Sequence, residues 1–165
     1  MIVSADGIES SRILTDGSRR EIGLYEDPCT SQDWEDVALE RRSDAIKLHA
    51  AGRDVACLYY LGFTAECFAK ALCVARGRPV PRGHDGHDVP AIITHAGFSL
   101  QVLSPEVRNF LTDRDVSLRY QLMLPPDVNL KEEIDAANRF VSWCTTQLRR
   151  RASMQSRRAQ RRNKA

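Results

Sequence analysis

The chain has 165 residues, of which 42% are hydrophobic and 28% are charged, so its size fits one folded domain and its composition excludes disorder throughout. The formal net charge of +2 hides an asymmetry, because eight of the 24 basic residues lie from Arg149 onward, where no acid occurs. In the rest of the chain, 22 acidic residues outnumber 16 basic ones. This distribution excludes a uniformly basic nucleic-acid-binding protein.

The five cysteines are an odd number, and no two of them form a CxxC pair. Four lie in segments with a helical pattern, where a thiol acts as a small apolar residue. We therefore expect reduced, structural cysteines in a reducing compartment. The four scattered histidines complete no metal-ligand spacing with them, so we predict no metal site and no cofactor.

The sequence begins without the basic and then apolar pattern of a signal peptide. Its most apolar stretch, residues 55–75, is interrupted by Thr64, Glu66 and Lys70, which favours a buried helix over a membrane span. We expect a cytoplasmic protein that makes no membrane contact.

Residues 1–30 have weak periodicity and are set apart as an irregular N-terminal arm. Asp16 and Gly17 stand between two short apolar runs, which favours a small hairpin because this dipeptide readily adopts the tight turn. A flexible arm is the alternative.

Two long helices are predicted next. The first covers about 33–51, with side-chain oxygens near Thr30 to cap it and Gly52 to end it. The second covers about 54–76 and is apolar around most of its circumference. A helix of this kind is buried on all sides, so we place it at the centre of the fold.

The second half of the chain predicts three further helices. A Pro/Gly loop over 77–86 leads to a short helix from about Asp88 to His95. Ser104 and Pro105 start another helix, and the chain stays helical or extended through Leu118 until two prolines interrupt it. A last helix runs from about Asp127 to Arg150 or beyond.

The last helix carries an apolar seam at spacings of four and three residues, which is typical of a helix packed along another. The seam consists of Leu130, Ile134, Ala137, Val141, Cys144 and Leu148. Past Ala152 the chain is mainly Arg, Ser, Gln and Ala, with no apolar face to bury, so residues 152–165 are predicted to be a disordered basic tail. The sequence thus predicts an all-α bundle of about five helices over residues 31–151.

Four motifs follow one another along this region. A helix led by Trp34 is followed by AGRD at 51–54, and the central helix reads LGFTAECFAKAL over 61–72. GHDV stands at 86–89 and LRY at 118–120. This order and spacing resembles the HEPN domains, whose central helix often carries a Gly…Glu-Cys…Lys-Ala pattern, followed by Gly-His-Asp-Leu and a later Arg-Tyr pair. The resemblance covers about residues 33–150.

The HEPN resemblance implies an up-and-down helical bundle that commonly forms a homodimer. Some members of the family are metal-independent ribonucleases, often toxins or antiviral effectors, and carry an Arg-x4–6-His motif on a late helix. Others lack the motif and bind a nucleotide, RNA or a partner protein, commonly a nucleotidyltransferase.

The ribonuclease motif is missing where the family keeps it, because no histidine follows His95. Chance alone predicts about one or two pairs at this spacing in a chain so rich in arginine. Three such pairs occur, Arg42 with His49, Arg78 with His84, and Arg82 with His87. The first lies on the first long helix and the others in or beside the Pro/Gly loop. Arg82 and His87 are the alternative catalytic pair, and the chain is expected to be catalytically silent.

Glu66 and Lys70 are four residues apart on the central helix, in the favourable order for an ion pair. One interpretation is a partly buried pair that fixes the helix register. In the other, Lys70 and Arg119 line a cleft for a phosphate-bearing ligand, together with Tyr120 and His87. Helix capping is the simpler role for His87, and core packing the simpler role for Tyr120.

The basic tail should attract RNA or another polyanion through phosphate contacts that are not sequence-specific. A solvated tail that raises solubility is the alternative. The predicted contacts are Arg149, Arg150, Arg151, Arg157, Arg158, Arg161 and Arg162.

Taken together, these features favour a silent HEPN-like module that dimerises and binds a nucleotide, RNA or a partner protein in a defence or toxin–antitoxin setting. The alternatives are a metal-independent RNA endonuclease and a helical adaptor with no nucleotide ligand.

Overall fold

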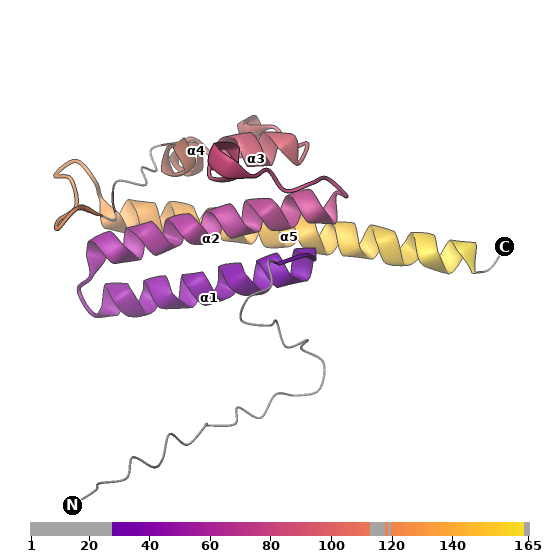
Figure 1. The fold of residues 1–165 in the computed structure, drawn as a ribbon, viewed down its shortest axis with the longest axis horizontal. Helices are drawn as coiled ribbons and strands as arrows, with labels where there is room; N and C mark the ends of the chain where they lie inside the picture. The colour runs from indigo at the N-terminus through magenta and orange to yellow at the C-terminus, as the bar shows by residue number, and fades with distance from the viewer. Residues whose placement is uncertain (1–27, 113–117, 119, 164–165) are drawn as a thin grey trace, which may run out of the picture.

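The computed structural model describes residues 28–112, 118 and 120–163. These residues form α-helices and two short 3₁₀ turns and contain no strand, which confirms the all-α prediction (Figure 1). The predicted arm or hairpin lies outside the described residues except for its last three. The helices are α1 (Ser31–Ala50), α2 (Asp54–Ala75), α3 (Val89–His95), α4 (Pro105–Thr112) and α5 (Leu130–Arg162).

α1 begins with a capping box. The Thr30 side chain accepts a hydrogen bond from the Asp33 N–H at 3.1 Å, and the Asp33 carboxylate accepts one from the Thr30 N–H at 2.8 Å. These two bonds satisfy backbone donors that a helix start leaves unpaired. On the face toward α2, the fully buried residues Ala38 and Ala45 are small enough for the two helices to approach closely.

α2 is the central helix, as the sequence predicts. Fourteen of its 22 residues are buried, and it packs against α1, α3 and α5. In Figure 1, α1 lies on one side of α2, and α3 and α4 lie on the other. By length and composition α2 alone among the described helices could cross a membrane, but 78% of its apolar window is buried within the fold, as in the core helix of a soluble protein.

The short helices α3 and α4 complete the core. The Asp88 side chain caps α3 by accepting a hydrogen bond from the Ala91 N–H at 3.0 Å, so the predicted cap is confirmed. α4 begins at Pro105 as predicted and buries Val107, Phe110 and Leu111. Two 3₁₀ turns that the sequence analysis did not predict, Gly83–Gly86 and Leu100–Val102, connect these elements.

α5 packs along α2 and α4 and begins at Leu130, three residues later than predicted. The Asn129 side chain caps it by accepting a hydrogen bond from the Glu132 N–H. Its buried stripe differs from the predicted seam. Leu130, Ile134 and Val141 of the seam are only partly buried, and Phe140, which the seam did not include, is buried. The buried residues are Ala136, Ala137, Phe140, Cys144 and Leu148.

The prediction of a disordered tail after Ala152 is wrong for residues 152–162. α5 continues to Arg162, and all of these residues are exposed (Figure 1). Arginine, alanine and glutamine have high helix propensity, and extending a helix avoids the cost of nucleating one. An apolar periodicity appears in the sequence only where one face of a helix is buried, so it gives no sign of the exposed last turns of α5.

Candidate functional site

A cleft of about 1050 Å³ opens at the C-terminal end of α2. Three segments form its wall: the start of α1, the last turns of α2 and the loop over 77–87. These segments meet because α1 and α2 are antiparallel, so the beginning of one lies beside the end of the other (Figure 1). The lining residues that carry polar or aromatic side chains are Cys29, Trp34, Lys70, Arg78, Arg82 and His87.

The Glu66 carboxylate bridges two residues of this wall. Its Oε1 accepts a hydrogen bond from Lys70 Nζ at 2.6 Å, and its Oε2 lies 3.1 Å from His87 Nδ1. The side chains of Glu66 and Lys70 are only 9% and 11% exposed. The predicted ion pair is therefore a buried one, and the same carboxylate attaches the loop to α2 through His87.

Trp34 holds Lys70 from the side of α1. The Lys70 ammonium lies over the indole ring, 4.9 Å from its centroid, which is a favourable cation–π distance. The ammonium is therefore fixed between a carboxylate on its own helix and an aromatic ring on the neighbouring one. Such a cation is already in position when a ligand arrives.

The loop over 77–87 is anchored at both ends. The Arg78 guanidinium donates a hydrogen bond to the His95 carbonyl, and the His95 ring nitrogen Nε2 lies 3.0 Å from the Pro79 carbonyl oxygen. At Gly86 a Cβ atom would lie 2.8 Å from the Pro81 carbonyl oxygen, so no other residue fits without a backbone shift. These contacts hold the backbone that carries Arg82 and His87.

The described lining of the cleft carries positive charge. Lys70, Arg78 and Arg82 are cationic, and the Glu66 carboxylate that balances Lys70 is not among the described residues that line the cleft. His87 Nδ1 faces Glu66, so Nε2 is the ring nitrogen left to contact a ligand. The arrangement can bind an oxyanion and can place an imidazole beside it.

Of the three Arg–His pairs found in the sequence, only Arg82 and His87 both line the cleft. The Arg42 guanidinium is occupied by Asn138 Oδ1, at 2.9 and 3.2 Å, between α1 and α5. The His49 ring faces Asp54 at 3.2 Å. The structure thus places the alternative catalytic pair of the sequence analysis in the same cleft as Lys70.

Tyr120 does not belong to this cleft, and Arg119 lies outside the described residues. Tyr120 is 77% exposed, so the packed role is wrong. The residues after it, 121–124, line a separate hollow of about 620 Å³ beside the first turns of α2. The predicted ligand set is therefore divided, with Glu66, Lys70 and His87 together and Tyr120 toward the opposite end of α2.

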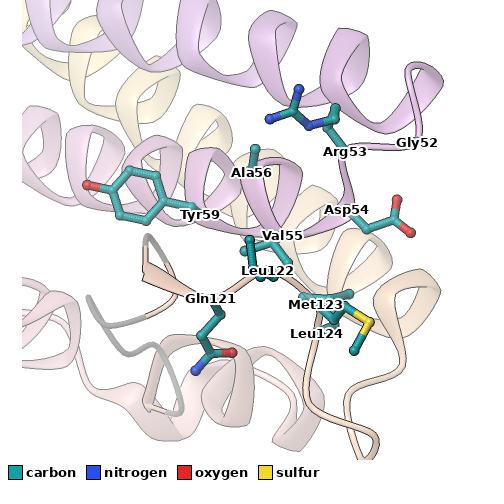
Figure 2. Close-up of a pocket in the computed structure, with 10 residues that line it drawn as sticks. All are labelled: Gly52, Arg53, Asp54, Val55, Ala56, Tyr59, Gln121, Leu122, Met123 and Leu124. Carbon is teal, nitrogen blue, oxygen red and sulfur yellow. The ribbon is translucent and has the colours of Figure 1, made fainter.

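That second hollow offers little to an anion. Figure 2 shows the segment 121–124 beside the start of α2, where Arg53 and Asp54 carry opposite charges. Asp54 also faces His49. Two of its lining residues are exposed apolar side chains, Leu122 at 98% and Met123 at 80% exposure.

The arginines predicted to contact a polyanion all lie on the last turns of α5. Arg149 is near Glu35. The pKa of Glu35 is raised, chiefly by burial and then by the neighbouring Asp36, and the Arg149 guanidinium offsets part of this rise. Arg151 Nε donates a hydrogen bond to the Ala75 carbonyl at 3.1 Å. The remaining five, Arg150, Arg157, Arg158, Arg161 and Arg162, are exposed.

Three of the four buried cysteines are poor nucleophiles. Burial raises the pKa of the Cys73 thiol to about 11, and burial also raises the pKa values of Cys57 and Cys144. Such thiols stay protonated at neutral pH. In the part of the chain that the structure describes, no three His, Cys, Asp or Glu side chains lie close enough together to hold a metal ion.

Sequence reasoning missed two members of the cleft, Trp34 and Arg78. Trp34 was visible as the first apolar residue of α1, but its position against Lys70 depends on how α1 and α2 pack. Arg78 was visible only as a member of a chance pair, while its contact with the His95 carbonyl depends on the path of the loop.

The buried ion pair yields a prediction about stability. Lys70→Met leaves the Glu66 carboxylate buried without its ammonium partner, so the free energy of unfolding should fall by about 3 kcal/mol. Replacing both residues, as Glu66→Leu with Lys70→Met, removes the unpaired charge and should restore most of that loss. Denaturant unfolding measures both changes.

The matched control is Arg41→Met, which breaks a partly exposed pair with Asp44 and a cation–π contact with Tyr60 and should cost less than about 2 kcal/mol. A double variant that is less stable than Lys70→Met alone would contradict the view that the unpaired carboxylate causes the loss.

Comparison with known proteins finds no matching family model, no similar curated protein and no similar solved structure. The HEPN resemblance therefore depends on the ordered motifs of the sequence, and the function depends on the chemistry of the cleft.

Proposed function

We propose that the chain is a catalytically silent, HEPN-like binding module of the cytoplasm whose cleft at the end of α2 binds a phosphate-bearing ligand, a nucleotide or an RNA. One observation supports this proposal above the others: Lys70, Arg82 and His87 line one cleft, and the Glu66 carboxylate that contacts Lys70 and His87 is not among its described lining residues. Guanidinium and ammonium groups are the side chains that recognise phosphate oxygens.

The cleft also has the properties of a preformed site. Its volume of about 1050 Å³ is large enough for a nucleotide. Lys70 is held by Glu66 and Trp34, so little conformational entropy is lost when it meets an anion. Arg82 is exposed and able to close on the ligand from the loop.

The HEPN resemblance supports two further parts of the proposal, a protein partner such as a nucleotidyltransferase and a defence or toxin–antitoxin setting. A helical adaptor would also bind a protein partner, but its cleft would bind no nucleotide. Nucleotide binding is therefore the property that separates the two.

The binding prediction uses ATP and a short RNA as probes. In a Trp143→Phe background Trp34 is the sole tryptophan, and it lines the cleft, so its fluorescence should change on binding. Arg82→Ala removes a charge-assisted contact and should weaken binding about tenfold. Arg53→Ala, at the opposite end of α2, should leave the affinity unchanged. Equal affinity in all variants, or no binding of either probe, would refute the proposed site.

A second candidate function, a metal-independent RNA endonuclease, is favoured by one specific contact. Glu66 holds His87 by Nδ1, as an orienting carboxylate does in general acid–base sites, and Arg82 lines the same cleft to stabilise a phosphorane. The missing late-helix motif argues against it.

We expect purified wild-type protein to leave total cellular RNA intact in the presence of EDTA, because the family motif is absent. Electrophoresis of the RNA over a time course measures this. Cleavage that disappears in both His87→Ala and Arg82→Ala, but persists in Arg53→Ala, would establish the endonuclease and overturn the silent module.

The proposed module also forms a homodimer, as the HEPN resemblance implies. α1 and α2 offer exposed apolar residues for the contact, because Leu39 is 44%, Ile46 55% and Phe63 37% exposed. Light scattering at micromolar concentration should give twice the chain mass of 18.6 kDa. Ile46→Asp should shift the mass toward a monomer, and a monomeric wild type would contradict this part of the proposal.

A further inference from the structure

The last turns of α5 form an arm that no other described element covers. From Ala152 to Arg162 every residue is exposed, and Leu148 is the last buried one. We define the C-terminal arm as residues 152–162. At 1.5 Å per residue it is about 16 Å long. Figure 1 shows it extending past the end of the bundle.

The arm leaves the bundle at the end where the cleft lies. At its base, Arg151 donates a hydrogen bond to the Ala75 carbonyl of α2. Val74 and Gly77, on either side of Ala75, belong to the wall of the cleft. A ligand held along the arm would therefore begin close to the cleft.

The positive charges of the C-terminal arm lie on one side of the helix, together with that of Arg150. At about 100° per residue, the five exposed arginines from Arg150 to Arg162 fall within about 140° of the helix circumference. Arg150, Arg157 and Arg161 form one row along the helix, and Arg158 and Arg162 form a second. We call these five residues, with Met154 between the rows, the arginine face. The rest of the circumference is small or uncharged, with residues Ala152, Ser153, Gln155, Ser156, Ala159 and Gln160.

The arginine face repels itself in the free protein. Arg157 with Arg161, and Arg158 with Arg162, are four residues apart, a spacing at which like charges destabilise a helix. The sequence from Arg149 onward contains no acid that could offset this repulsion. A ligand with closely spaced negative charges removes it, and a nucleic-acid duplex carries one charge per about 1.7 Å of its axis.

The composition of the arm distinguishes among anionic partners. A helix that lies in a membrane surface needs an apolar face opposite its charges, and this arm offers alanine, serine and glutamine there. Binding of single strands relies on aromatic side chains that stack on bases, and the arm has none. A straight helix with one basic face instead matches the regular phosphate rows of a duplex.

We propose that the arginine face of α5 binds the sugar–phosphate backbone of a double-stranded nucleic acid without reading its sequence. This inference does not depend on the ligand of the cleft. The contacts are guanidinium to phosphate, which guanidinium groups make with two parallel hydrogen bonds. RNA and DNA duplexes share this chemistry, and the experiment compares them.

The experiment measures fluorescence anisotropy of short labelled RNA and DNA duplexes, and of the single-stranded RNA, with the full chain over a range of salt concentrations. The first variant changes Arg157, Arg158, Arg161 and Arg162 to Gln. It should weaken duplex binding at least tenfold and reduce the slope of log affinity against log salt by about 3 to 4, for four lost phosphate contacts.

A charge-matched variant tests the face itself. Exchanging Ser156 with Arg157, and Arg158 with Ala159, keeps composition and net charge but spreads the five guanidinium groups over about 240° of the helix circumference. It should bind duplex several-fold more weakly than wild type, with unchanged helicity by circular dichroism. Nucleotide binding in the cleft should be unchanged in both variants, and Arg53→Ala, which lies outside the cleft and the arm, should leave duplex binding unchanged.

Several outcomes would overturn the proposal. They are wild-type affinity in either arm variant, equal competition by polyglutamate, and tighter binding of single-stranded RNA than of duplex when Arg82→Ala has weakened the cleft. Tight binding to vesicles of anionic lipid that competes with duplex would assign the arm to a membrane surface instead. Equal affinity for RNA and DNA duplexes supports pure backbone recognition, as does a modest preference for one of them with the same salt dependence.

Discussion

The cleft depends on one buried carboxylate. Glu66 sits on the central helix, accepts a hydrogen bond from Lys70 and faces His87, so it fixes a cation within its own helix and attaches the following loop to the core. A carboxylate in this position is stable only while its partners are present, because an unpaired buried charge is costly. The ammonium that keeps this buried carboxylate paired is therefore the same cation that faces the cleft, so replacing Lys70 alone affects both the fold and the cleft.

Much of the fold was predictable because burial leaves a periodic trace in the sequence. The all-round apolar pattern of α2 indicated a central helix, and the side chains of Thr30 and Asp88 indicated where two helices start. The C-terminal arm left no such trace, since it buries nothing and is helical through propensity and continuity with α5. The 3₁₀ turn that carries the loop past Gly86 depends on a close backbone approach to Pro81, which residue types alone do not encode.

The candidate site was predictable where its residues share one helix and unpredictable where they do not. The spacing of Glu66 and Lys70 indicated a pair, and the loop motif singled out His87. That Trp34 covers Lys70 follows from the antiparallel packing of α1 and α2. Grouping Tyr120 with them came from the HEPN resemblance, whereas the structure exposes its side chain beside the segment that borders the start of α2. Spacing within one helix thus predicted which side chains lie together, whereas the order of motifs along the chain did not.

The unbroken course of α5 has a geometric consequence for the arm. Because no turn separates Phe140 in the core from the guanidinium groups outside, the direction in which those groups point is set by the register of the buried stripe. One residue added after Leu148 would turn the arm by about 100° about its axis, while seven would return it close to its original heading. A short insertion or deletion after Leu148 would therefore change the direction in which the arginine side chains point much more than it would change the length of the arm.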